Sequence, residues 1–349
     1  MEIKISGRKI GPKEKVFIIA EISANHCQNY EIAEKTIIAA KEAGADAIKM
    51  QTYTPDTITM DCGSSLFQIK HGSAWDGKTL YSLYKEAYTP WEWQPKLKKL
   101  AESLGMAWFS TPFDRTAADF LEKINVPAYK IASQEINDLP LIEYIAKKGK
   151  PVLLSTGIAT LKEIKEAVQA CKKAGNRQIA VLKCTSEYPA AFEDINLKTI
   201  PDLEKKFGTV MGISDHTLGE AVPIAGIALG ARIIEKHFIL DKKIGGPDAS
   251  FSMEARDFAG MVQSIREAEK ALGKVTYKLN ARIKKNRDFR RSLFASKDIK
   301  KGEKFSQENV RSIRPGFGLE PKFFRKLIGK KAKKEIKKCT PLSWKLVEK

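Results

Sequence analysis

Cysteine is scarce in this chain, and the few cysteines are far apart. The 349 residues include five cysteines, which are Cys27, Cys62, Cys171, Cys184 and Cys339. Their number is odd and none forms a CxxC pair, so neither a disulfide framework nor a zinc knuckle is the basis of the fold. We expect five reduced thiols.

Long apolar runs are missing too. The longest, at 16–20 and 221–229, are much shorter than the roughly 20 residues that a membrane-spanning helix needs. The N-terminal segment MEIKISGRKI has no apolar core of the kind found in secretory signal peptides. We therefore expect a soluble, cytoplasmic protein without a membrane partner.

An excess of positive charge is confined to the C-terminal part of the chain. Residues 281–349 contain 23 Lys and Arg against 7 Asp and Glu, whereas residues 1–280 contain 38 against 35. This change in composition marks a domain boundary, and we divide the chain into 1–273, a polar linker at 274–290 and a small β-rich domain at 291–349. A basic tail can meet nucleic acid, an anionic substrate or a partner subunit, and charge alone does not decide among them.

The first domain repeats one pattern, a short apolar run followed by a stretch with helical periodicity. Continuous rather than alternating apolar runs are typical of parallel strands that are covered on both faces. The runs are VFIIAEI from Val16, AIKMQTY from Ala47, MAWFSTPF from Met106, AYKIAS from Ala128, PVLLSTG from Pro151, IAVLKCT from Ile179, VMGISDH from Val210 and RIIEKHF from Arg232. Eight such units predict an α/β fold, a (β/α)8 TIM barrel.

Helix signals between the runs agree with this prediction. We expect helices at 32–43, 91–104 and 161–174, each ending at a glycine. The alternative is a doubly wound open sheet, which needs a glycine-rich phosphate loop after its first strand, and AEISANHCQN is not such a loop. One connection, between the second run and Trp91, is long and rich in aromatic residues. We interpret it as a substrate wall rather than a surface excursion.

Polar residues stand at the ends of the eight runs, where the active sites of barrels lie. Lys49 and Lys130 come from different strands and can converge on the barrel axis. Nearby hydroxyls, from Thr111, Ser133, Ser155, Ser186 and Ser214, would complete a cradle for phosphate and carboxylate groups. The alternative is that either lysine forms an ion pair with Glu21 or Glu135 that holds the mouth together. Either glutamate is also a candidate general base.

Histidine is rare, with only four residues. His216 and His237 end consecutive strands and would point into the same space, which favours a divalent metal over two structural histidines. His26 follows the first strand and could join this site, and His71 lies in the long insertion. Arg314, in the turn-like SIRPGFG, could clamp a substrate.

The motifs IAEISANH, ADAIKMQTY, FSTPF, YKIAS, LLSTG, LKCTSEYP, GISDHT and IEKHF resemble the successive strand motifs of the sialic acid synthase family. The segment ASKDIKKGE…VRSIRPGFG resembles the antifreeze-like (SAF) domain that follows the barrel in that family. The resemblance covers nearly the whole chain. It implies an enzyme that condenses phosphoenolpyruvate with an N-acetylated sugar.

The resemblance also implies a role for each matching residue. Phosphoenolpyruvate would be held by Lys49, Thr111, Lys130, Ser133, Ser155, Ser186 and Ser214. The sugar would face Glu21, Gln51, Tyr188 and Asp248. His216 and His237 would hold a divalent metal, manganese in most members, with magnesium or cobalt as alternatives. Family members are domain-swapped homodimers, so Arg314 would enter the barrel of the other subunit, which gives the basic tail a use that requires no nucleic acid.

Within the family, QTYTPDTIT and the insertion WDGKTLYSLYKEAYTPWEW are most similar to the branch that makes pseudaminic acid, a nine-carbon acid found on bacterial surface structures such as flagellin. This branch uses 2,4-diacetamido-2,4,6-trideoxy-altropyranose. Ser186 stands where N-acetylneuraminate-forming members often have Asn, which agrees with the same branch. The remaining alternative is the same chemistry on another sugar, giving N-acetylneuraminic or legionaminic acid.

Overall fold

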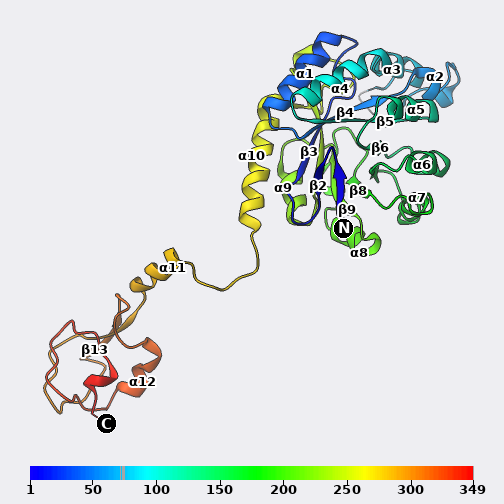
Figure 1. Ribbon diagram of the computed structural model, residues 1–349. Helices are drawn as coiled ribbons and strands as arrows, with labels where there is room; N and C mark the ends of the chain where they lie inside the picture. The colour runs from blue at the N-terminus through cyan, green and yellow to red at the C-terminus, as the bar shows by residue number, and fades with distance from the viewer. Residues whose placement is uncertain (71, 73–74, 349) are drawn as a thin grey trace. The chain divides into compact units, whose positions relative to one another are not determined.

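The computed structural model describes residues 1–70, 72 and 75–348. The chain forms two compact units, Met1–Gly273 and Lys274–Lys349 (Figure 1). No helix within the described ranges is long and apolar enough to cross a membrane.

The first unit is a closed barrel of eight parallel strands. The strands are β3 (Phe17–Glu21), β4 (Ala47–Thr52), β5 (Ala107–Pro112), β6 (Tyr129–Ile131), β7 (Val152–Ser155), β8 (Ile179–Cys184), β9 (Val210–Asp215) and β10 (Ile233–Ile239). Each strand pairs with the next, and β10 pairs with both β9 and β3. This double pairing closes the sheet and confirms the barrel over the open-sheet alternative.

One helix follows each strand and packs outside the ring (Figure 1). The barrel helices are α1 (Tyr30–Glu42), α4 (Gln94–Ser103), α5 (Arg115–Lys123), α6 (Leu139–Ala146), α7 (Leu161–Lys173), α8 (Thr199–Phe207), α9 (Ala221–Ala228) and α10 (Ala255–Leu272). Side chains cap several of them: Asn29 accepts from the backbone of Ile32, and Thr160 begins α7 in a capping box. Of the helix expected at 91–104, residues Trp91–Trp93 form the 3-10 helix η2.

Short elements occupy the connections of the barrel. The long insertion before α4 contains α2 (Pro55–Ile58), η1 (Ser65–Phe67) and α3 (Leu80–Ala87). Further along the chain lie η3 (Phe192–Asp194), η4 (Lys242–Ile244) and β11 (Met253–Glu254), the last of which pairs with the end of β10.

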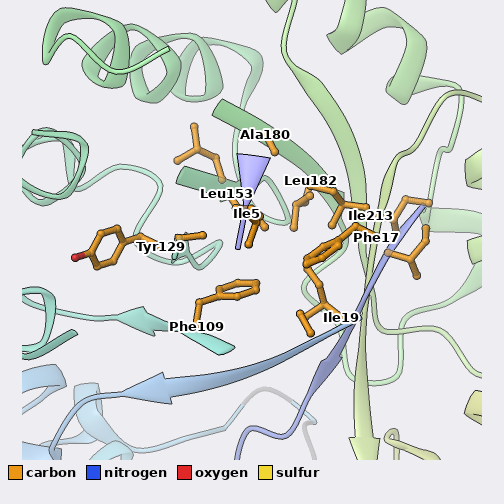
Figure 2. Close-up of a cluster of buried hydrophobic side chains, with 14 of the residues drawn as sticks. Ile5, Phe17, Ile19, Phe109, Tyr129, Leu153, Ala180, Leu182 and Ile213 are labelled. Atoms are coloured by element: carbon orange, nitrogen blue, oxygen red, sulfur yellow. The ribbon is translucent and has the colours of Figure 1, made fainter. Parts of the chain in front are cut away.

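Every second residue of a strand faces the barrel interior, and the inner positions near the amino ends of the strands are apolar. Phe17 and Ile19 of β3, with Phe109 and Leu182, belong to this core (Figure 2). The sequence patterns did not predict the element that completes it, an antiparallel hairpin of β1 (Ile3–Ile5) and β2 (Arg8–Ile10). Figure 2 shows Ile5 among the inner side chains, and its side chain is fully buried.

The second unit has its own small core. It begins with α11 (Ala281–Asn286) and η5 (Arg287–Phe289), and β12 (Ser292–Ala295) pairs antiparallel with β13 (Val310–Ile313). Isolated bridges, η6 (Pro321–Phe323), α12 (Phe324–Leu327) and η7 (Trp344–Leu346) complete it. Leu293, Ile299 and Phe305 are buried at its centre.

Replacement of Ile5 by alanine should destabilise the barrel, because the deleted methyl groups leave a cavity that the closed ring of strands cannot collapse. We expect Ile5→Ala to lower the free energy of unfolding by about 2–4 kcal/mol in urea titrations followed by circular dichroism. Ile38→Ala on the outer face of α1, where the side chain is 41% exposed, is the control. Equal effects of the two substitutions would contradict a packing role for the hairpin.

Candidate active site

A cavity of about 510 Å³ opens at the carboxyl ends of the barrel strands. Most of the residues that the sequence singles out line it, namely Glu21, Lys49, Gln51, Thr111, Lys130, Ser133, Glu135, Ser155, Tyr188, Ser214, His216, His237 and Asp248. The twofold alternation of a strand explains this convergence, since Glu21 shares a face with the core residues Phe17 and Ile19.

Two lysines and two glutamates form a buried charge network on the floor of the cavity. Lys49 Nζ lies 2.6 Å from Glu21 Oε2 and 3.6 Å from Glu235 Oε1. Lys130 Nζ donates to both carboxylate oxygens of Glu235, at 2.6 and 2.8 Å, and Ser214 Oγ donates to the same group at 3.0 Å. Each charge therefore has a partner, without which burial would cost several kcal/mol per ion.

The partner of Lys130 differs from the one we predicted. The ion-pair alternative named Glu21 or Glu135, and the structure bears it out for Lys49 with Glu21. Lys130 instead pairs with Glu235, because Glu235 stands on β10 with its side chain directed across the barrel mouth. A lysine in an ion pair has further donor hydrogens, so Lys49 and Lys130 can also bind an anionic ligand.

The two glutamates of the network differ in proton affinity. Burial alone would raise the pKa of Glu235, but Lys130 and Lys49 outweigh it and hold that pKa at about 2. Burial raises the pKa of Glu21, an effect that Lys49 offsets only in part and that the charge of Glu235 reinforces. Glu235 therefore loses its proton more readily than Glu21 does.

The serine hydroxyls next to this network form an incomplete cradle. Ser133 Oγ accepts from the backbone N–H of Gly157 at 2.9 Å. Ser155 Oγ and Ser186 Oγ are buried and have no hydrogen-bond partner among the described residues. Because buried hydroxyls are almost always satisfied in folded proteins, these two are available to bind the oxygen atoms of a ligand.

Gly157 keeps this cradle open. A Cβ at position 157 would lie 2.0 Å from Ser186 Oγ and 2.8 Å from Ser133 Oγ. A larger residue would therefore fill the space between the hydroxyls. Lys49 Nζ donates to Thr111 Oγ1 at 3.3 Å, so the cavity lining combines cations and hydroxyls, the groups that bind phosphate and carboxylate.

The two histidines at the ends of β9 and β10 face each other, with ring centroids 5.4 Å apart. His216 donates from Nδ1 to the carbonyl of Thr185 at 2.8 Å, which leaves Nε2 as the acceptor nitrogen. Burial, helped by the positive neighbours, holds the pKa of His237 well below its usual value, and its buried Nδ1 has no hydrogen-bond partner within the described chain.

This donor set fits a divalent ion with open coordination positions. The described residues contain no group of three His, Cys, Asp or Glu around one point. The protein would therefore supply two imidazoles, and water and substrate oxygens would supply the other ligands. Such a site leaves room for a substrate to bind the ion directly.

Polar and aromatic groups continue from the histidines towards the outer part of the cavity. Gln51 Nε2 donates to Ser23 Oγ at 2.8 Å and to Glu21 Oε1 at 3.3 Å. The Tyr188 ring packs on His216 with centroids 4.2 Å apart. Asp248 Oδ2 accepts from the backbone N–H of Ala24 at 3.3 Å.

Three of the described residues named from the sequence are not among those lining the cavity. Ser186 lies directly behind Gly157, and Arg314 lies in the second unit, exposed on a turn where Ser292 Oγ donates to the Pro315 carbonyl at 2.6 Å. The suggestion that His26 joins the site is wrong, because its two ring nitrogens bind Thr89 Oγ1 and the Gln28 backbone N–H, away from the cavity. His71 lies outside the described residues.

Sequence reasoning assigned no role to Glu235, Cys184 or Gly157. Strand alternation places Glu235 at the cavity, since it stands two residues before His237 and shares its face. Cys184 ends β8 in the same way and lines the cavity, with Sγ 3.9 Å from His216 Nδ1. No local signal distinguishes Gly157 from other loop glycines.

Comparisons with known proteins show which family has this combination of domains. A family model described as the NeuB family matches residues 36–277, and a SAF domain model matches residues 290–348. The chain is 51% identical to the pseudaminic acid synthase of Campylobacter jejuni over 93% of this chain and 94% of that protein. It is 46% identical to the pseudaminic acid synthase of Helicobacter pylori, over 93% of this chain and 96% of that protein.

A solved structure is similar in fold as well. The N-acetylneuraminic acid synthetase of Leptospira borgpetersenii, a crystal structure in complex with citrate, superposes with a TM-score of 0.73 and is 32% identical. The match covers 82% of this chain and 95% of that one.

The buried carboxyl group of Glu135 should make stability depend on pH. Burial raises its pKa from the usual 4.5 to about 7, so the folded state keeps a proton that the unfolded state has released. The contribution of Glu135 to stability is complete at a pH below the pKa of this group in the unfolded chain. It is lost as the pH rises through the pKa of the group in the folded protein. The shift corresponds to about 3 kcal/mol.

We expect Glu135→Gln to unfold at higher urea concentration than the wild type at about pH 8 and to lose this advantage near pH 5. The control is Glu166→Gln on the outer surface of α7, which should not change the pH profile. Parallel profiles for the wild type and Glu135→Gln would contradict the raised pKa.

Proposed function

The chain belongs to the NeuB family and ends in a SAF domain, and on this basis we propose that it condenses phosphoenolpyruvate with 2,4-diacetamido-2,4,6-trideoxy-altropyranose to give pseudaminic acid and phosphate. The observation that carries the reaction is a cavity lined by two buried lysines and by the Ser155 hydroxyl, which has no hydrogen-bond partner among the described residues. The choice of sugar rests on the Campylobacter and Helicobacter relatives.

Phosphoenolpyruvate would lie on the polar floor. Lys49 and Lys130 offset its charge, and the hydroxyls of Thr111, Ser133, Ser155, Ser186 and Ser214 bind its oxygens. The sugar would lie above it, against Gln51, Tyr188 and Asp248. This arrangement brings C3 of phosphoenolpyruvate towards the reacting carbon of the sugar and excludes bulk water, since most of these side chains are buried.

The reaction joins C3 of phosphoenolpyruvate to the aldehyde carbon of the open-chain sugar, which leaves positive charge at C2. Water then adds to C2, and Glu21 or Glu135 accepts its proton, because burial raises the pKa of both groups. The tetrahedral C2 expels phosphate together with the bridging oxygen, and the two lysines stabilise the departing charge.

His216 and His237 would hold a divalent ion, with manganese as our first choice and magnesium or cobalt as alternatives. A bound ion of this kind supplies Lewis-acid polarisation of the sugar carbonyl. Within the chain, the hydrogen bond from His216 to Thr185 orients the ring, and burial keeps His237 neutral.

A second candidate keeps this reaction and changes the sugar. The solved Leptospira relative is an N-acetylneuraminic acid synthetase, so N-acetylmannosamine is the competing substrate, and the precursor of legionaminic acid is the next. The two readings share the polar floor and differ only in the part of the cavity that meets the sugar.

The first test is release of phosphate from phosphoenolpyruvate in the presence of Mn²⁺, with the 6-deoxy di-N-acetylated sugar or N-acetylmannosamine. We expect release with the former, abolished by EDTA, and a loss of about a hundredfold or more in kcat for Lys130→Met. Lys162→Met, whose side chain is 84% exposed, is the matched control and should retain full activity. Release with N-acetylmannosamine alone would favour the second candidate. No release with either sugar, or with the precursor of legionaminic acid tried next, would contradict the reaction.

We also propose that the enzyme is a domain-swapped homodimer in which Arg314 serves the barrel of the other subunit. The exposed position of Arg314 on an anchored turn supports this role. Chains carrying Arg314→Ala and chains carrying Lys130→Ala should each be inactive.

A mixture of the two variants should recover about a quarter of the wild-type activity, because half of the dimers then hold one site with both residues intact. Native mass spectrometry would verify that subunits have exchanged. A mixture that stays inactive after exchange would contradict the swap.

A further inference from the structure

The cavity has two chemically different ends. Its floor carries the lysines, glutamates and hydroxyls described above. Its outer part is lined mainly by apolar side chains of the insertion between β4 and α4, which are Ile58, Leu66, Ile69, Trp75, Leu80, Leu83, Tyr84 and Ala87. The polar chemistry of the reaction does not use this surface, which we call the insertion wall.

The insertion wall is an ordered structure with its own hydrogen bonds. Thr54 and Thr79 form capping boxes at the starts of α2 and α3. The backbone N–H of Ile69 donates to the Lys78 carbonyl at 2.9 Å, next to an isolated antiparallel bridge between Gln68 and Thr79. Trp75 Nε1 donates to the Pro247 carbonyl at 2.8 Å, so the wall is also tied to the far side of the cavity. Such anchoring makes the wall a shaped surface that can discriminate between ligands.

One aromatic group reaches from the wall to the region of Glu135. Tyr84 of α3 packs edge-on against Tyr53, with centroids 5.5 Å apart, and Tyr53 packs against Phe113 at 5.2 Å. Leu83, the residue before Tyr84, is 7% exposed and also lines the cavity. This part of the wall presents flat rings and a branched aliphatic side chain.

A second aromatic group reaches from the wall to the histidines. Trp75 lies 5.5 Å from Tyr188 and 6.3 Å from Phe251, measured between ring centroids. Phe251 in turn lies 5.1 Å from His237. The insertion therefore contributes one ring to each of two apolar surfaces, and both surfaces border polar groups of the site.

We infer that the insertion wall selects sugars whose outer positions carry methyl-bearing groups rather than hydroxyls. The inference rests on the proposed function and deepens it. In 2,4-diacetamido-2,4,6-trideoxy-altropyranose, the substituents beyond C3 that differ in kind from those of N-acetylmannosamine are the acetamido group at C4 and the methyl group at C6. N-acetylmannosamine has hydroxyl-bearing groups at both positions.

The physical reason is the difference in desolvation. A methyl group gains free energy when it leaves water for an apolar surface, whereas a hydroxyl that is placed there without a partner loses its hydrogen bonds to water. A single methyl-sized contact of this kind changes kcat/KM by roughly 10–200-fold. Flat rings beside polar groups suit an acetamido group in particular, since its methyl end is apolar and its amide is polar.

The test is the ratio of kcat/KM for the 6-deoxy di-N-acetylated sugar to that for N-acetylmannosamine. We expect Leu83→Asn and Ile69→Thr, which make two separate segments of the insertion wall more polar, each to lower this ratio about tenfold. The KM for phosphoenolpyruvate should not change, because the floor is intact. Lys85→Asn, on the exposed face of α3, is the matched control and should keep the wild-type ratio.

Circular dichroism melting of each variant identifies any loss of folding, and two variants on different segments guard against it. If the wild type prefers the deoxy sugar and both variants are folded, an unchanged ratio in the two variants would overturn this inference and leave the proposed function standing. A wild-type preference for N-acetylmannosamine would overturn the sugar proposed above and with it the methyl selectivity of the wall.

Discussion

The network of Lys49, Lys130, Glu21 and Glu235 is the interaction on which the rest of this site depends. Four charges lie inside the mouth of a barrel, where an unpaired charge would cost several kcal/mol. They are tolerable only because strands β3, β4, β6 and β10 hold the partners within 2.6–3.6 Å of one another. Closure of the sheet through β10 supplies that geometry, and the core around Ile5 and Phe17 supports it from below.

The network also sets the chemical character of the cavity. Its cations and anions balance, so the floor can receive an anionic substrate without a large excess of buried positive charge when the cavity is empty. Glu235 remains ionised beside Lys130, while burial leaves Glu21 able to take up a proton. Because the two neighbouring carboxylates differ in proton affinity, one site can hold both a fixed negative charge, on Glu235, and a base, Glu21.

Much of the site follows from a simple rule about parallel strands. Side chains two residues apart in a strand lie on the same face of the sheet. A polar residue at the carboxyl end of a barrel strand therefore points into the active site when the residue two positions earlier belongs to the apolar interior. This rule finds Lys49, Lys130, His216 and His237, and Glu235 obeys it as well. It cannot find which cation meets which anion, because that depends on distances across the barrel, and it therefore missed the pairing of Lys130.

What the sequence determined by itself is local or periodic. The apolar runs, the capping residues and the charge break near residue 280 are all encoded in neighbouring residues, and they suffice for a barrel followed by a small domain. Only the tertiary structure decided which long-range neighbours meet. The N-terminal hairpin enters the core, and His26 turns to Thr89 instead of the site. These outcomes depend on burial and on contacts between residues far apart in the chain, which no short window of sequence records.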